Sequence, residues 1–156
     1  MQDVEGRLVG PDDCNCLAVR QAARHITQFY DQLLAPSGLR TTQFSILAKL
    51  RRLGPMTINA LAAEMVMDRT TLGRNIRPLE RDGLIAVEQG RDDRRSKELR
   101  LTEAGTARFG AGVKGWVEAQ RQFEAAFGAK RTVAMRALLH AVAATDLGTS
   151  AIGTEA

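Results

Sequence analysis

The spacing of apolar residues changes once in the middle of this chain, and that change restricts the folds open to it. From Val19 to Leu79 apolar residues recur at steps of three and four, which predicts helices. The helical spacing is lost over residues 84–89 and 97–102, which are predicted to be two short strands. In the second, Leu99 and Leu101 alternate with charged neighbours, as expected of a half-buried strand. Helical spacing returns after residue 102. We therefore expect a mainly α fold with one small β-hairpin, whose polar tip spans residues 90–96.

Helix boundaries follow from residues that start or stop helices. Proline disfavours a helical predecessor and glycine frees the backbone, so Pro36 and Gly128 are expected to mark two helix ends. Short polar side chains accept hydrogen bonds from the first free N–H groups of a helix. Those expected to do so are Thr41 or Thr42, Thr57 and Asp68. The expected helices span residues 13–35, 42–53, 57–65, 69–81, 102–127 and 130–147. The apolar face of the second comprises Phe44, Leu47, Leu50 and Leu53.

A length of 156 residues predicts one domain. We expect it to cover residues 13–147, with a lobe at 39–102, flanking helices at 13–36 and 103–147, and flexible tails at 1–12 and 148–156. The sequence has no run of ~18 apolar residues and no secretory signal pattern, so neither a membrane span nor secretion is expected. Two cysteines, Cys14 and Cys16, form no disulfide framework, which fits the reducing cytoplasm.

Enzyme, metal and cofactor sites are not expected. His25 and His140 are too few and too far apart for a metal site, and no His/Cys cluster has the spacing of ligands. Nucleophile-elbow, phosphate-loop and metalloprotease motifs are absent from the sequence. The sequence therefore favours a binding protein over an enzyme.

Positive charge is concentrated in the middle of the chain. Residues 40–100 contain 13 Lys and Arg against 8 Asp and Glu, whereas the rest of the chain has 9 and 10. Such an asymmetry is typical of a module that binds a polyanion. The alternative is a solvated surface of mixed charge.

Arginines gather on two expected elements, the helix at 69–81 and the hairpin that follows it. Three helices followed by a strand, a basic hairpin and a strand is the order of a winged helix-turn-helix, whose recognition helix reads the major groove of DNA. Arginine pairs with guanine, asparagine with adenine, and threonine contacts the thymine methyl. The candidate residues on the helix are Arg69, Thr70, Thr71, Arg74, Asn75 and Arg77. Those on the hairpin are Arg91, Asp93, Arg94, Arg95 and Lys97.

Residues 39–102 resemble the MarR family of bacterial transcription regulators. The motifs that carry the resemblance are residues 57–62, 68–72 and 79–85, the hairpin run Asp93-Arg94-Arg95-Ser96, and the closing Leu99 to Gly105. The flanking helices extend it to about residues 13–147. The resemblance implies a homodimer built from the first and last helices. It also implies binding to double-stranded, pseudo-palindromic operator DNA as a repressor that a small aromatic effector releases.

The resemblance also implies roles for single residues. Residues 69–71, Arg74 and Asn75 would lie in the major groove, and Arg95, braced by Asp93, would reach the minor groove. Thr41, Thr42 and Thr57 would lie near phosphates at helix N-termini.

The apolar face of the helix at 102–127 favours packing against a partner helix over packing within the chain. This face comprises Phe109, Val113, Trp116, Val117, Phe123 and Phe127.

A thiol-based sensor of oxidants, specifically of organic peroxides, is the alternative to a small-molecule effector. Residues 16–30 are similar to the first helix of the organic-peroxide-sensing branch of the family, with Cys16 at the reactive thiol and Tyr30 at one supporting tyrosine. Thr41 stands where a second tyrosine is expected, so the chain departs from that branch. The expected sensor or effector pocket comprises Cys16, Arg20, His25 and Tyr30. A third reading, a protein-interaction module that has lost DNA binding, is disfavoured by the intact arginines.

Overall fold

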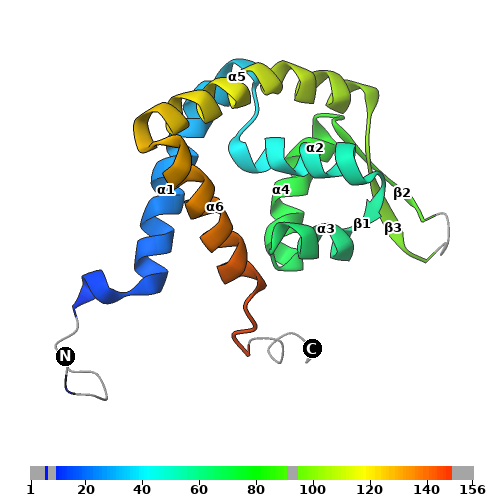
Figure 1. Cartoon of the computed structure of the whole chain (residues 1–156). Helices are drawn as coiled ribbons and strands as arrows, with labels where there is room; N and C mark the ends of the chain where they lie inside the picture. The colour runs from blue at the N-terminus through cyan, green and yellow to red at the C-terminus, as the bar shows by residue number, and fades with distance from the viewer. Residues whose placement is uncertain (1–5, 7–9, 91–94, 149–156) are drawn as a thin grey trace. The chain divides into compact units, whose positions relative to one another are not determined.

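The chain is mainly helical, with a small antiparallel sheet, in a computed structural model that describes residues 6, 10–90 and 95–148 (Figure 1). The first helix, α1 (Asn15–Leu34), follows a short 3-10 turn, Pro11–Asp13, and precedes another, Ala35–Ser37. Then come α2 (Thr41–Leu53), β1 (Met56–Thr57), α3 (Ile58–Met65), α4 (Arg69–Arg81), β2 (Ile85–Gln89), β3 (Lys97–Leu101), α5 (Glu103–Phe127) and α6 (Ala129–Ala144). The described residues up to 119 form one compact unit and those from 120 a second.

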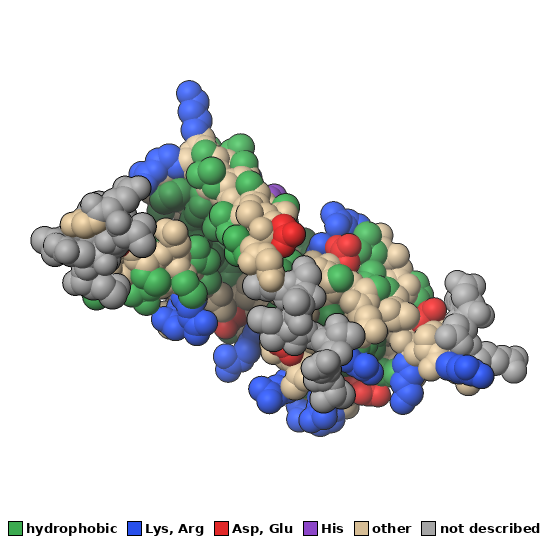
Figure 2. All heavy atoms as spheres, turned by 90° about the horizontal axis from the view of Figure 1, so that it is seen from below, with side chains coloured by type: hydrophobic (Ala, Val, Ile, Leu, Met, Phe, Trp, Pro, Cys, Tyr) green, Lys and Arg blue, Asp and Glu red, His purple; other side chains and the backbone are tan. Residues whose placement is uncertain are grey.

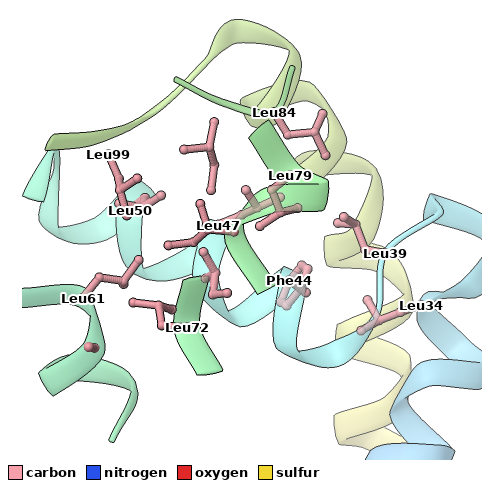
Figure 3. Close-up of a cluster of buried hydrophobic side chains, with 14 residues drawn as sticks. Leu34, Leu39, Phe44, Leu47, Leu50, Leu61, Leu72, Leu79, Leu84 and Leu99 are labelled. Carbon is pink, nitrogen blue, oxygen red and sulfur yellow. The ribbon is translucent and has the colours of Figure 1, made fainter. Parts of the chain in front are cut away.

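A hydrophobic core holds the first unit together around α2 (Figure 3). α3, α4, β2 and β3 each add at least one buried leucine or isoleucine, whereas Met56 of β1 is only partly buried against the core. Burying a leucine or isoleucine side chain contributes about 1.5–3 kcal/mol. The core comprises Leu34, Leu39, Phe44, Ile46, Leu47, Leu50, Leu61, Ala62, Leu72, Ile76, Leu79, Leu84, Ile85 and Leu99. Leu53, expected on the apolar face of α2, is instead 44% exposed, because it lies in the last turn beyond the core.

The sheet has the strand order β1-β3-β2, and both pairings are antiparallel. The hairpin of β2 and β3 is in the expected place, with Ile85 opposite Leu101 and Gln89 opposite Lys97. The additional strand, β1, pairs Met56 with Leu99. Its two residues are too few to show a periodicity. Three helices and a three-stranded sheet in this order form a winged helix, as expected.

Helix starts confirm two of the expected caps and correct a third. Thr57 Oγ1 accepts from the Ala60 N–H at 3.2 Å, and Asp68 accepts from the Thr71 N–H at 2.8 Å. Neither Thr41 nor Thr42 caps α2, since the residue at that position is Arg40. The α2 start needs no short polar cap of its own, because the side chains of Gln43 and Asp31 accept from the Arg40 and Thr41 N–H groups.

The predicted partner-facing side of α5 is partly wrong. Phe109 and Val113 pack against the core of their own chain, and the Phe109 ring stacks on Phe44 at 4.9 Å between centroids. Trp116 also lies over Phe44, at 6.1 Å. The first half of this helix therefore covers the lobe, while Val117 is 52% exposed. Gly128 ends α5 at a φ of 97°, as expected, and α6 ends at Ala144 rather than at residue 147.

Candidate nucleic-acid interface

A tight turn joins α3 to α4 in the helix-turn-helix, and the side chain of Asp68 caps the start of α4. Asp68 accepts from both the N–H and the hydroxyl of Thr71, at 2.8 and 2.6 Å. The Thr71 hydroxyl, followed by its N–H, lowers the pKa of the Asp68 carboxyl. A carboxylate at a helix N-terminus is also stabilised by the helix dipole. The Asp68 cap therefore stabilises the beginning of α4.

Val66 makes the turn between these helices in an unusual backbone conformation. Its φ of 51° and ψ of 48° are left-handed, a region that costs a β-branched residue about 1–2 kcal/mol. The side chain is 74% exposed, so little packing compensates for the strain. The N–H groups of Val66 and Met67 bond to the Ala63 and Ala62 carbonyls, which holds the turn in place.

Val66→Gly is expected to stabilise the chain by about 1 kcal/mol, because glycine adopts positive φ without strain. Urea unfolding at fixed protein concentration would measure the gain. Val117→Gly is the matched control, since Val117 is similarly exposed but lies in the regular helix α5. That substitution should lower stability by about 0.5–1 kcal/mol. Equal losses from both variants would contradict the strain at Val66.

One side of α4 faces the core and the opposite side is exposed. Leu72, Ile76 and Leu79 are buried. At 100° per residue, the side opposite them carries Thr70, Arg74, Arg77 and Arg81, all of which are exposed. Arg69 is also exposed, at the first position of α4. Arg81 pairs with Asp82 at 3.1 Å, so the unbalanced charge of this stripe comes from its earlier residues.

Asn75 lies on the flank of α4 rather than on this exposed stripe. Its Nδ2 donates to the Thr71 carbonyl at 2.8 Å, and the side chain is half-buried. Reading an adenine would require this bond to be exchanged for two bonds to the base. Arg74 and Asn75, both predicted to lie in the major groove, therefore differ in exposure: Arg74 lies on the exposed stripe and Asn75 is half-buried on the flank.

A hollow of about 400 Å³ separates this flank of α4 from α1 and α2. It brings Arg74 and Asn75 of α4 close to Arg40, a residue that sequence reasoning missed. Arg40 is exposed at the start of α2. It belongs to the basic middle of the chain, but it lies outside α4 and the hairpin, the two elements to which the DNA-binding motifs pointed. The residues lining the hollow are Thr27, Asp31, Arg40, Thr42, Gln43, Arg74, Asn75 and Pro78.

The hairpin of β2 and β3 presents basic side chains beside its tip. Arg95 and Lys97 are exposed, while Arg91, Asp93 and Arg94 lie outside the described residues. Arg100 Nε donates to Glu88 across the strands at 3.1 Å, and this bond, with the charge of the carboxylate, raises the pKa of Arg100. Its charge is thus balanced within the hairpin. Figure 2 shows Lys and Arg side chains spread over this face of the molecule, with several along its lower edge.

The three threonines predicted near phosphates differ in their bonding. The Thr41 hydroxyl donates to Asp31 Oδ1 at 2.7 Å, so a bond from it to a phosphate would have to replace this one. Thr57 Oγ1 is the acceptor at the start of α3, and Thr42 lines the hollow. An ion pair also joins α2 to α3: Lys49 Nζ donates to Glu64 Oε2 at 2.8 Å. This hydrogen bond and the charge of the lysine lower the pKa of Glu64.

The four residues predicted for a sensor or effector pocket lie along α1. Cys16, Arg20 and His25 are exposed, and Tyr30 is half-buried with its ring edge-on to Phe29 at 5.7 Å. None of the four lines the hollow between α1, α2 and α4. Cys14 Sγ accepts from the Leu17 N–H at 3.4 Å, and both thiols are free. Across the described ranges, no group of three His, Cys, Asp or Glu residues is placed to hold a metal ion.

Residues 39–97 match the model of the MarR family. Over 85% of its length the chain is 36% identical to the transcriptional regulator MosR of M. tuberculosis, solved in complex with DNA; it covers 100% of that chain with a TM-score of 0.70. This chain belongs to the MarR family. The family match covers α2 to the start of β3, the part that presents both arginine-bearing elements.

Two relatives of this MarR-family chain come from Bacillus subtilis. The HTH-type regulator YwoH is 33% identical over 91 residues, which are 58% of this chain and 66% of YwoH. The organic hydroperoxide resistance transcriptional regulator is 27% identical over 90 residues, 58% of this chain and 61% of that protein. The chain thus spans just under two thirds of the length of these relatives. No helix of the MarR-family chain, within the residues described, has the length and apolarity to cross a bilayer.

Proposed function

We propose that this chain is a transcription regulator that binds double-stranded operator DNA in the cytoplasm. The observation that carries the proposal is the exposed arginine stripe of α4 next to the basic hairpin, Arg95 and Lys97. A helix of this kind fits the major groove, and a β-ribbon arginine fits the narrow minor groove. Arg40 and Thr42 at the start of α2, and Thr57 at the start of α3, are suited to phosphates, because helix N-termini attract anions.

The active form in this proposal is a homodimer. Large apolar side chains are exposed on α1 and on α6, and Figure 2 shows apolar side chains at the surface. Exposed apolar surface marks protein interfaces. Within α6, Leu138 is 68% exposed and Val142 is 54% exposed. In α1, Val19 is 45% exposed. A second copy would cover these faces and present two lobes to a pseudo-palindromic site.

The regulation we propose is repression that a small aromatic effector relieves. The hollow between α1, α2 and α4 has a volume suited to such a molecule. An aromatic acid between Arg40 and Arg74 would occupy charges that the DNA backbone and bases also require. This hollow is a second candidate site for the effector, beside the pocket predicted from Cys16, Arg20, His25 and Tyr30, none of which lines it.

Two arginine variants test the DNA-binding proposal. Arg95→Ala is expected to weaken operator binding by about 1–3 kcal/mol with the dimer intact. Arg74→Ala is expected to relax base preference more than it lowers affinity for unrelated DNA. Binding of each variant to a series of single-base operator variants, at one salt concentration, separates the two effects. Unchanged affinity for the first variant and unchanged preference for the second would exclude both residues from recognition.

A thiol switch is the second candidate for the regulatory input. Cys16 is exposed in the first turn of α1, and one relative is an organic hydroperoxide resistance transcriptional regulator. In the proposed step the thiolate sulfur attacks the peroxide, breaks its O–O bond, becomes a sulfenic acid and releases the alcohol.

Titration with tert-butyl hydroperoxide is expected to release DNA from the wild-type protein and not from Cys16→Ser. Cys14→Ser is the matched control, since Cys14 is also exposed but serves as the cap of α1. Mass spectrometry would locate the oxidised sulfur. Release that persists in Cys16→Ser would remove this cysteine as the sensor.

A further inference from the structure

The start of α2 is capped by a residue from another helix. Thr41 is the first residue of α2, and its N–H donates to Asp31 Oδ1 of α1 at 2.7 Å. The Thr41 hydroxyl donates to the same oxygen at 2.7 Å. Arg40 adds a longer ion pair to the other carboxylate oxygen, at 3.9 Å. One carboxylate therefore ties α1 to the first turn of α2.

The position of Asp31 within α1 gives no local reason for a carboxylate. It lies in the last turn, where the negative end of the helix dipole disfavours acidic side chains. Its side chain is 26% exposed, so water screens the bonds to Thr41 only in part. Hydrogen bonds to an ionised acceptor are shorter and stronger than neutral ones, as these lengths illustrate. The two hydrogen bonds from Thr41 of α2 therefore compensate for the unfavourable interaction of Asp31 with the dipole of α1.

The connection between α1 and α2 is held at several points, and the bonds from Asp31 are the last of them along the chain. Ser37 Oγ donates to the Leu34 carbonyl at 2.7 Å, Gly38 takes a positive φ of 73°, and Leu39 is buried. The link is therefore anchored at the α1 end and in the core. The bonds from Asp31 to Thr41 then fix the direction in which α2 leaves it. Because α2 packs on α3, α4 and β3, its direction also sets that of the lobe.

We propose that Asp31 is a positioning residue that fixes the angle between α1 and the DNA-binding lobe, and thereby the spacing of DNA half-sites that a dimer accepts. The inference rests on the proposed function, in which α1 belongs to the dimer scaffold and α4 to the DNA surface. Moving a half-site by one base pair displaces it along the duplex and rotates it about the axis. A rigid junction penalises such a change, and a loosened junction tolerates it.

The experiment measures affinity against half-site spacing. A duplex selected by the wild-type protein from a random DNA pool supplies the reference site, and two derivatives have one base pair more or fewer between the half-sites. The wild-type protein should bind the derivatives about ten-fold more weakly. Asp31→Ala should bind the reference site about ten-fold more weakly than the wild type does, given the loss of two bonds to a charged acceptor. Its affinities for all three duplexes should agree within about two-fold.

Two variants separate positioning from folding. Asp31→Asn keeps a carbonyl oxygen that accepts both Thr41 bonds, so it should retain the spacing preference. Thr41→Val keeps only the N–H bond and should show an intermediate preference. If Asp31→Ala still binds the two derivatives about ten-fold more weakly than the reference site, as the wild type does, the inference is overturned, whether or not its affinity is lower at every spacing. A wild-type protein that selects no duplex overturns the proposed function and this inference with it, which distinguishes the two failures.

Discussion

Gly105→Ala is expected to lower the free energy of unfolding by about 3 kcal/mol, near the upper end for overpacked sites. For a chain of this size that is roughly a 10 °C fall in Tm. Gly105 is buried where α5 begins, directly over the end of the loop before β2. A Cβ at this position would overlap the carbonyl oxygen of Leu84 and lie 2.8 Å from Leu101 Cδ1. Because the Leu84 carbonyl is backbone, the overlap is relieved only when α5 moves away from the sheet.

The surrounding bonds explain why the separation is costly. Thr102 Oγ1 accepts from the Gly105 N–H at 2.9 Å and donates to the Gly83 carbonyl at 2.7 Å. The Thr102 N–H donates to the Leu84 carbonyl at 3.2 Å. An added methyl group would force these polar groups apart while they remain partly buried, which adds the cost of unsatisfied hydrogen bonds.

Gly110→Ala is the matched control, because Gly110 lies in the same helix with nothing within 4 Å of the added Cβ. It should raise stability by about 0.5–1 kcal/mol through helix propensity. Urea unfolding of the wild type and both variants at one protein concentration keeps the concentration-dependent contribution of association the same in the comparison. Two stabilising substitutions would mean that α5 does not approach the Leu84 carbonyl as the structure has it.

Elements with a signal of their own could be predicted from the sequence. The helix over 69–81 was predicted from the spacing of Leu72, Ile76 and Leu79, and its cap from Asp68. The hairpin followed from the alternation around Leu99. In each case residues close in the sequence determine the structure, so their order along the chain is sufficient.

Features that depend on distant residues could not be predicted in this way. The Asp31 cap on Thr41 joins residues ten positions apart on different helices, so no capping motif records it. The side of α5 that carries Phe109 is apolar whether it meets its own lobe or a partner, and only the packing on Phe44 decides between them. The hollow beside Asn75 likewise depends on distant residues, because its lining comes from α1, α2 and α4 together.

Operator affinity is expected to fall by about 10³–10⁵ between 50 and 200 mM salt, which is the range for about six to ten neutralised phosphates. Each lobe of the proposed dimer offers several basic or N-terminal groups to the backbone. Among the described residues these include Arg40, Thr42, Thr57 and Lys97. Bound cations leave the DNA when these groups replace them, and added salt opposes that release. Fluorescence anisotropy with a labelled operator at five salt concentrations would give the slope.

Arg40 is the residue that makes this measurement specific. Arg40→Ala should reduce the slope of log affinity against log salt by about two, one unit for each copy in the dimer. Arg40→Lys retains the charge and should retain the slope, although it loses the planar geometry of the guanidinium. Arg74→Ala should change base preference with a smaller effect on the slope, because its proposed contact is to bases. If Arg40→Ala leaves the slope unchanged, the hollow between α2 and α4 lies away from the backbone. An effector bound in that hollow would then not compete with a DNA phosphate for Arg40. The Arg40→Ala variant therefore also tests whether the effector and the operator DNA compete for the same residue.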